Sequence, residues 1–261
     1  MSRIRFAAAD GVGRITLARP DKKNALDREA ANELGEALAR CSADVTVRAV
    51  LLDAEGADFC AGADLAALAT LVDARAQAQH DDAMALGSVF VAMRELPKPV
   101  VAAVRGRALA GGAGLATACD IVLAEDDATF GYPEVRVGFV PAMVMTMLRR
   151  SVGEKQAFDL VATGRVLSAR EALDVGLVSR VVPTGTLDAA ASELARGLAA
   201  SPPGALAFTK RLFYDLDGRA FRDGIALGAK VNVEARATAE FRDGIRRFLE
   251  GKGKGGGTRP S

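Results

Sequence analysis

Two continuous apolar segments constrain the fold more than any other feature of this sequence. VRAVLLDA (residues 47–54) and PKPVVAAVRG (residues 97–106) lack the regular alternation of polar and apolar side chains found in half-exposed strands. Such runs are typical of strands that are covered on both faces. Before the first run, Leu26, Ala30, Leu34 and Leu38 recur at four-residue spacing, which predicts an amphipathic helix. The first 185 residues therefore predict an α/β fold.

The pattern changes after LVSRVVP (residues 177–183). EKQAFDLVATG (residues 154–164) is predicted to be a helix that ends at Gly164, and SARE (residues 168–171) has the spacing of a capping box. Beyond about residue 186 only helical patterns remain, followed by a glycine-rich basic tail. We predict three parts: a core of residues 1–185, a helical region of residues 186–250, and a disordered tail of residues 251–261.

Composition and charge exclude several classes of protein. Thirty-four basic residues against 33 acidic ones give no basic field for a nucleic-acid partner. No apolar run approaches the roughly 18 to 20 residues that span a bilayer, and the start MSRIRFAAADG lacks a signal-peptide core. Three cysteines, Cys41, Cys60 and Cys119, are unlike a disulfide framework. We expect a cytoplasmic protein without a membrane or nucleic-acid partner.

The single histidine limits the possible catalytic sites. His80 lies in the polar, helix-prone stretch ARAQAQHDDAMA, and we expect it to be a solvated helix residue. A serine–histidine triad or a histidine-based zinc site would have to use this one residue. We therefore predict no metal site, and we expect Cys60 to be a small buried residue and not a nucleophile.

Two glycine-containing stretches each follow a predicted strand and enter a predicted helix. ALAGGAGLATACD (residues 108–120) fails the dinucleotide pattern because Thr117 stands where a third glycine is needed. GADFCAGADLAAL (residues 56–68) enters its helix near Asp64. The first N–H groups of such helices can bind a phosphate or an oxyanion that develops on a carbonyl. Two separated amides could form an oxyanion hole, and two ordinary glycine turns are the alternative.

Several motifs together resemble the crotonase, or enoyl-CoA hydratase/isomerase, superfamily over residues 3–250. They are NALD (24–27), FCAGADL (59–65), ALAGGAGLATACD (108–120), FGYPEVRVGFVP (130–141) and TGRVLSAREALDVGLVSRVVP (163–183). The resemblance implies a crotonase-like spiral of ββα units with a C-terminal helical trimerisation region. It also implies an acyl-CoA thioester as substrate, a homotrimer or a dimer of trimers, and no cofactor beyond the coenzyme A of the substrate. The oxyanion amides would be those of Ala63 and Gly111.

The resemblance assigns further residues to substrate and coenzyme A binding. These are Lys22, Lys23, Ala61, Asp64, Leu65, Gly114, Tyr132 and Phe248. Lys22 and Lys23 match a region that contacts the coenzyme A phosphates, or they are plain surface charges. Phe248 matches an aromatic near a neighbour's adenine, but Gly251 stands where a lysine is expected three residues later. The Tyr132 hydroxyl either reaches the acyl pocket or serves strand packing.

The chain departs from the family pattern at one catalytic position. Well-known hydratases of the family hold a water between two glutamates; Glu134 matches the second, but Gly114 replaces the first. We expect Glu134 to lie on a strand next to Val135 and Val137, where partial burial raises its pKa towards neutrality. The segment AMVMTML (residues 142–148) replaces a common family sequence and could line the acyl pocket with methionines.

A single carboxylate fits more than one function. EVRVGFVPA (residues 134–142) is similar to bacterial methylglutaconyl-CoA hydratase-like relatives, which favours a lyase of fatty acid metabolism that hydrates an α,β-unsaturated, branched acyl-CoA. In a Δ3,Δ2-enoyl-CoA isomerase, the alternative, Glu134 would move a proton between two carbons. A non-catalytic acyl-CoA-binding homologue is the second alternative.

Overall fold

The computed structural model describes residues 2–253, which divide into two compact units after Ala200. The strands are β1 (Ile4–Ala9), β2 (Val12–Leu17), β3 (Ala49–Ala54), β4 (Val100–Val104), β5 (Arg107–Leu109), β6 (Ile121–Glu125), β7 (Thr129–Gly131), β8 (Val166–Ser168) and β9 (Arg180–Val182). The helices of the first unit are α1 (Arg28–Ala43), α2 (Leu65–Ala69), α3 (Ala76–Glu95), α4 (Gly111–Ala118), α5 (Val144–Ser151), α6 (Glu154–Thr163), α7 (Ala169–Asp174) and α8 (Leu187–Ala200), with 3-10 helices η1 (Pro20–Lys22) and η2 (Pro133–Val137).

The larger sheet of the first unit has six strands in the order β1-β2-β3-β4-β6-β9. Its first two strands form an antiparallel hairpin, and the remaining pairs are parallel. Asp10 and Gly11 connect the hairpin with φ values of 52° and 78°, as a two-residue type I′ turn requires. Every residue of β3 and β4 is buried, as their continuous apolar sequences predict.

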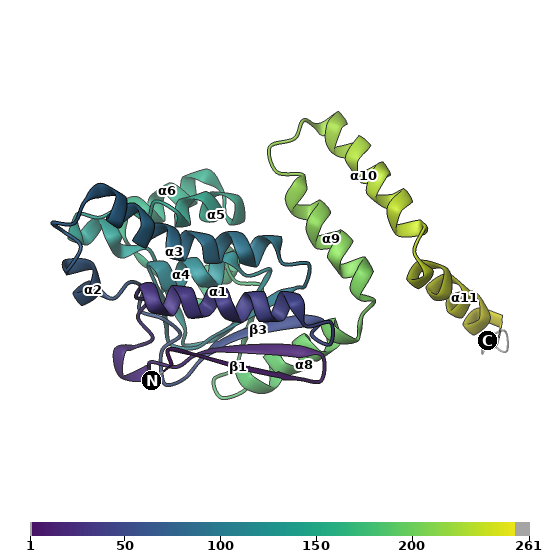
Figure 1. Cartoon of the computed structure of the whole chain (residues 1–261), viewed down its shortest axis with the longest axis horizontal. Helices are drawn as coiled ribbons and strands as arrows, with labels where there is room; N and C mark the ends of the chain where they lie inside the picture. The colour runs from purple at the N-terminus through teal and green to yellow at the C-terminus, as the bar shows by residue number, and fades with distance from the viewer. Residues whose placement is uncertain (1, 254–261) are drawn as a thin grey trace. The chain divides into compact units, whose positions relative to one another are not determined.

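Helices cover both faces of this sheet (Figure 1). On one face, α1 and α3 contribute to the main core, and α1 buries Leu34, Leu38 and Cys41. On the other face, α8 packs its small side chains at four-residue spacing, Ala191 and Ala195, against strand residues that include Val101 and Leu123. The α/β prediction is confirmed, and β3 and β4 lie between two layers of helices.

The position of α8 changes the domain boundary. The sequence analysis placed residues 186–200 in the C-terminal helical region, but α8 contributes to the core of the first unit, so this boundary was wrong. The buried alanines of α8 form one cluster with Leu51, Val101, Ala103 and Leu123 of the sheet. The break between the two units therefore falls after Ala200.

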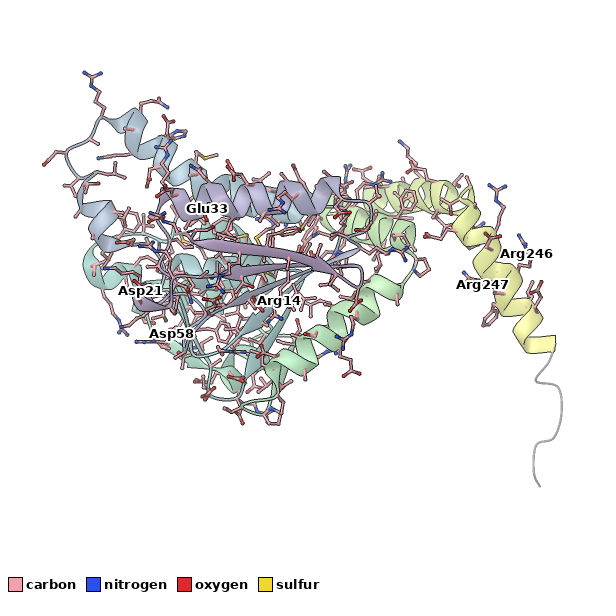
Figure 2. All side chains as sticks on the ribbon, turned by 60° about the horizontal axis from the view of Figure 1, so that its bottom comes forward. Arg14, Asp21, Glu33, Asp58, Arg246 and Arg247 are labelled. Atoms are coloured by element: carbon pink, nitrogen blue, oxygen red, sulfur yellow. The ribbon has the colours of Figure 1, made fainter. Side chains whose placement is uncertain are left out.

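The second unit is helical in its described part. It contains α9 (Pro203–Asp215), α10 (Phe221–Arg236) and α11 (Ala239–Gly253), and Arg211 of α9 pairs with Glu234 of α10 at 2.7 Å. Arg246 and Arg247 project from α11 (Figure 2). Residues 251–253 complete α11, so the predicted tail begins too early, and residues 254–261 lie outside the described residues. Trimerisation by this region stays a prediction.

The described residues contain neither a candidate membrane-spanning helix nor a candidate metal site. Within residues 2–253, no helix combines the length and apolar character that a membrane crossing requires. The same residues contain no cluster of three or more histidine, cysteine or acidic side chains suited to a metal ion.

Asn24 is expected to hold two loops of the first unit together. Its side chain donates to the carbonyl oxygens of Glu55 and Asp58 at 2.9 and 2.8 Å, and accepts from the Arg19 N–H at 2.8 Å. We predict that Asn24→Ala lowers the free energy of unfolding by about 2–4 kcal/mol, because one buried and two partly buried backbone groups lose their partner.

Lys23→Ala is the matched control for this prediction. Lys23 shares the left-handed backbone of Asn24, with φ values of 52° and 55°, but its side chain is exposed. Urea denaturation of both variants separates the lost hydrogen bonds from backbone strain. Equal losses of stability would show that the Asn24 side chain contributes little.

Candidate active site

The two glycine stretches lie side by side. The loop of residues 58–63 runs parallel to β5: the Cys60 N–H donates to Arg107 O at 2.9 Å, and the Leu109 N–H donates to Cys60 O at 2.9 Å. A side chain at Gly112 would collide with the Cys60 carbonyl oxygen, so only glycine allows this approach. A Cβ added to Gly62 would lie 3.4 Å from the Gly111 nitrogen. The residues before α2 and before α4 are therefore neighbours.

The Gly111 amide stands at the start of α4. Ala110, the preceding residue, has φ 49° and ψ −123°, a conformation that costs a non-glycine residue roughly 1–3 kcal/mol. Its N–H donates to Gly131 O at 2.8 Å, and its carbonyl accepts the first helical bond, from the Gly114 N–H. The Gly111 N–H precedes this first bond and donates to no group in the described residues.

The Ala63 amide is directed by its neighbours. The Leu26 N–H donates to Gly62 O at 2.8 Å, and the Asp64 N–H donates to Leu26 O at 2.7 Å. In a parallel bridge these two bonds turn the N–H of the intervening residue, Ala63, to the opposite side. Throughout residues 2–253 the Ala63 N–H has no acceptor. Both predicted amides are thus available on adjacent loops.

Glu134 lies on the 3-10 helix η2, and the prediction of a strand here was wrong. Pro133 starts η2, and Gly138, with φ 73°, ends it, so the chain turns where the valine spacing suggests extension. Val135 and Val137 are 44% and 70% exposed and do not flank the carboxylate in a core. A turn, not a strand, therefore places Glu134.

The Glu134 carboxylate is buried and only partly hydrogen-bonded within the described residues. Glu134 is 9% exposed, and its Oε2 atom accepts no hydrogen bond from the described part of the chain. Burial raises the pKa of Glu134, although its own backbone N–H lowers it. The predicted direction of this shift is confirmed. Such a carboxyl is suited to exchange protons near neutral pH.

Apolar side chains fill the space beside Gly114. A Cβ at this position would lie 2.7 Å from Val144 Cγ2, on α5, and 3.1 Å from Phe90 Cζ, on α3. Gly114 itself is buried in α4. The position at which the family pattern has its first glutamate is therefore closed by packing, and no larger side chain fits without movement of Val144.

Tyr132 is fully buried immediately before η2. Its hydroxyl oxygen lies 2.7 Å from Thr117 Oγ1, on α4. Burial, followed by the charge of Glu134, raises the pKa of the Tyr132 hydroxyl, against the hydrogen bond to Thr117. The phenol is therefore neutral at physiological pH, and its oxygen contacts a side chain of α4.

Most of the residues expected to bind substrate or coenzyme A lie in or next to the same loops. Lys22 and Lys23 are exposed on and after η1, and the Ala61 N–H donates to Lys23 O at 3.0 Å. Asp64 caps α2 by accepting from the Ala66 and Ala67 N–H groups, and Leu65 is 67% exposed. Their roles in binding stay predictions. Phe248 lies on α11, in the second unit.

Cys60 is a buried thiol without nucleophilic character. It is fully buried, and burial raises its pKa to about 12. Its backbone, not its sulfur, organises the site, through the two hydrogen bonds with β5. The expectation of a small buried residue is confirmed.

The sequence analysis missed several organising residues. Arg19 donates to Ala25 O at 3.0 Å and pairs with Asp27 and Asp64. Asp58 accepts two bonds of 2.7 Å from the guanidinium of Arg107. The helix-capping aspartates, Asp27 and Asp64, can be recognised from the sequence, but their shared partner, Arg19, cannot.

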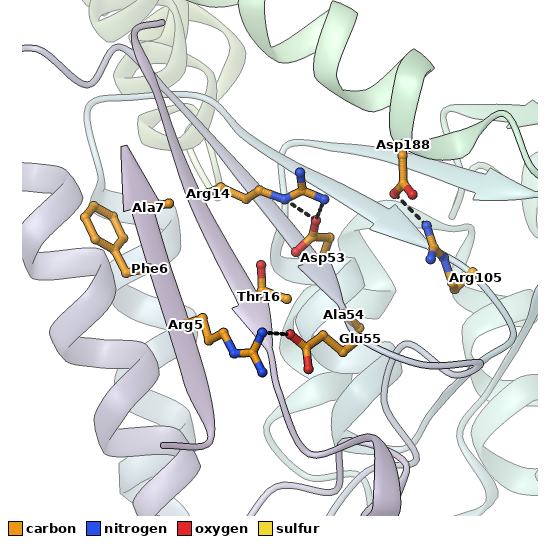
Figure 3. Close-up of a pocket in the computed structure, with 10 residues that line it drawn as sticks. All are labelled: Arg5, Phe6, Ala7, Arg14, Thr16, Asp53, Ala54, Glu55, Arg105 and Asp188. Carbon is orange, nitrogen blue, oxygen red and sulfur yellow. Dashed lines mark hydrogen bonds and ion pairs between the residues drawn. The ribbon is translucent and has the colours of Figure 1, made fainter. Parts of the chain in front are cut away.

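A cavity of about 460 Å³ elsewhere in the first unit contains none of the predicted site residues. Arginine–carboxylate pairs line it, including Arg14 with Asp53 and Arg105 with Asp188 (Figure 3). Its charges are largely balanced within the chain, so it does not compete with the Glu134 region as a candidate active site.

Comparison with known proteins agrees with this geometry. A relative from Thermus thermophilus named "Putative enoyl-CoA hydratase" is 44% identical over 236 residues, which cover 90% of this chain and 93% of that protein. The crystal structure of an enoyl-CoA hydratase from Mycobacterium smegmatis is 32% identical, with a TM-score of 0.91 over 96% of this chain and 97% of that one. That of an enoyl-CoA hydratase from Polaromonas sp. JS666 also has a TM-score of 0.91, at 31% identity over 95% of this chain and 96% of that one. The sequence model of the enoyl-CoA hydratase/isomerase family matches residues 7–255. The chain therefore belongs to the enoyl-CoA hydratase/isomerase family and has its crotonase fold.

Proposed function

We propose that this protein hydrates an α,β-unsaturated acyl-CoA thioester, with Glu134 as its single acid and base and the Ala63 and Gly111 amides as its oxyanion hole. The observation that carries the proposal is the buried Glu134 carboxylate, whose Oε2 atom has no hydrogen-bond partner among the described residues. Gly131, three residues before it, is bonded to Ala110 at the start of α4, which ties the carboxylate to the amides. The relatives named enoyl-CoA hydratases support the same reaction.

The two amides stabilise the charge that develops on the thioester oxygen. When a nucleophile adds to the β-carbon, the electrons of the double bond move onto this oxygen and form an enolate. Preorganised N–H groups in a site that excludes water contribute roughly 3–4 kcal/mol each to such a transition state. The thioester needs close access, and the small side chains of Ala63 and Gly111 provide it.

Glu134 carries out both proton transfers. The water oxygen bonds to the β-carbon, and Glu134 takes the proton that this water loses. The same carboxyl then gives a proton to the α-carbon as the enolate collapses, so one water is added and Glu134 is regenerated. The raised pKa of Glu134 makes the carboxyl an effective acid in the second step.

The packing at Gly114 favours an isomerase as the second candidate. Val144 and Phe90 leave an apolar wall where a second carboxylate would help to hold water. In a Δ3,Δ2-enoyl-CoA isomerase, Glu134 would move a proton between two carbons without water. We favour hydration because the relatives are named hydratases.

The acyl group is proposed to be branched and to lie near α3 and α5. Met143 and Met84 both approach Gly87 of α3, where an added Cβ would lie 2.9 and 3.6 Å from their sulfur atoms. Flexible methionines adapt to irregular apolar groups. The proposed assembly is a homotrimer or a dimer of trimers, and the reaction needs no cofactor besides the coenzyme A of the substrate.

Incubation with trans-2-enoyl-CoA substrates in heavy water tests the reaction. We expect a product heavier by one water, with one deuterium on carbon, by mass spectrometry, and faster turnover of a branched substrate than of a straight one. Deuterium on carbon without added water would instead support the isomerase. Binding without any change in either substrate would contradict both and support an acyl-CoA-binding homologue.

Glu134→Gln is expected to lower kcat by about 100-fold or more, because the amide cannot exchange the proton. Affinity for the acyl-CoA, measured by calorimetry, should stay within about threefold because the contacts to coenzyme A remain. Glu36→Gln, an exposed position on α1, is the control and should leave kcat unchanged. Full activity of Glu134→Gln would exclude Glu134 as the acid and base.

Glu134 is also expected to make stability depend on pH. Because its pKa is raised in the folded state, the folded protein binds more protons than the unfolded one between the ordinary glutamate pKa and the raised value. Stability should fall as pH rises through this window. Glu134→Gln should therefore melt at a higher temperature than the wild type above the window, and the difference should disappear below it. A constant difference at all pH values in thermal melts would contradict the raised pKa.

A further inference from the structure

The Glu134 carboxylate has little to hold it in place by itself. Oε2 has no hydrogen-bond partner within the described residues, so the orientation of the carboxylate depends on how the η2 backbone is anchored. One anchor is the backbone bond from Ala110 to Gly131, at 2.8 Å. A second anchor is the side chain of Tyr132, which immediately precedes η2.

The Tyr132 hydrogen bond has a defined direction. Thr117 Oγ1 lies 2.7 Å from the Ala113 carbonyl oxygen, which can only accept, so the single Thr117 hydroxyl proton is donated to Ala113. In the 2.7 Å contact between the two hydroxyl groups, Tyr132 must then be the donor and Thr117 the acceptor. The chain of hydrogen bonds runs from Tyr132 to Thr117 and ends on Ala113, in the first turns of α4.

The two anchors contact opposite ends of α4. Ala110 immediately precedes α4, and Thr117 is its penultimate residue. Two attachments separated by nearly two helical turns fix both the position and the rotation of η2 against α4. The N-terminus of α4 also presents the Gly111 amide, so this arrangement fixes the carboxylate relative to the proposed oxyanion hole.

We propose that Tyr132 is a positioning residue, which uses its hydrogen bond to Thr117 to hold Glu134 in register with the Gly111 amide. This inference rests on the proposed function, because it concerns turnover by Glu134. Tyr132 does not exchange protons itself: its own proton is engaged with Thr117, and burial raises the pKa of its hydroxyl. Small displacements of a catalytic group cost up to about 100-fold in rate, so a lost anchor should affect kcat.

Three variants test the proposal: Tyr132→Phe, Thr117→Val and the double variant. Each removes the hydrogen bond and nearly preserves side-chain volume. We expect all three to lower kcat by a similar factor, roughly 10-fold to 100-fold, with KM within about threefold. Thr117→Ser keeps the hydroxyl and should retain wild-type kcat.

The same variants affect stability in a different order. Thr117→Val leaves the buried Tyr132 donor without an acceptor and should be the least stable, whereas the double variant removes both partners and should recover stability. If the bond serves stability alone, kcat would follow this order or stay unchanged in all variants. Urea denaturation and steady-state kinetics on the full chain separate the two.

The outcomes distinguish this inference from the proposed function. Equal losses of kcat with unequal stabilities would support positioning by Tyr132. If Tyr132→Phe turns over enoyl-CoA as fast as the wild type, the positioning role of Tyr132 is overturned and the proposed function stays intact. A wild type without turnover would overturn the proposed function and this role with it.

Discussion

The parallel pairing of the 58–63 loop with β5 is the interaction on which the rest of the site depends. Two backbone bonds of Cys60 bring the residues before α2 next to the residues before α4. The Asp58–Arg107 ion pair and the side chain of Asn24 support the same loop from two other directions. Since the N–H groups proposed to form the oxyanion hole belong to the backbone, their geometry follows from this pairing and not from the side chains of Ala63 and Gly111.

The site combines several features that are unfavourable for stability. Ala110 adopts a strained conformation. Within residues 2–253, the buried Oε2 of Glu134 has no hydrogen-bond partner, and the N–H groups of Ala63 and Gly111 have no acceptor. Each is compensated by ordinary packing in the surrounding core, in which α1, α3 and α8 cover the sheet. An arrangement of this kind is expected where preorganised groups wait for charge that appears only during a reaction.

Local patterns in the sequence predicted local structure well. The buried strands β3 and β4, the capping box of Ser168 and Glu171, and the end of α6 at Gly164 all appear as predicted. The loops before α2 and α4 could be recognised because they contain glycines between a predicted strand and a predicted helix. The strand predicted at Glu134 was wrong because Pro133 starts a 3-10 helix and Gly138, in a left-handed conformation, ends it, so the chain turns at this point.

Contacts between distant segments could not be predicted in this way. A helix sequence shows an apolar face but not the surface that it covers, so α8 was assigned to the wrong part of the chain. Likewise, Gly114 shows that a glutamate is missing, but not that Phe90 and Val144 from two other helices fill its place. These contacts depend on the tertiary arrangement of α3, α4 and α5.

The filled space at Gly114 makes it difficult for this chain to acquire a glutamate at the position where the family pattern has its first one. A single substitution to glutamate would meet Val144 and Phe90 before the carboxylate reached the site. Making room first, by shrinking Val144, would open a cavity at a cost of about 1–3 kcal/mol before any catalytic benefit appeared. The first variant on this route, with a smaller residue at position 144, would be less stable than the present protein and no more active. The packing of three apolar atoms of Val144 and Phe90 against Gly114 is therefore expected to keep a second carboxylate out of this position, whether or not selection favours its absence.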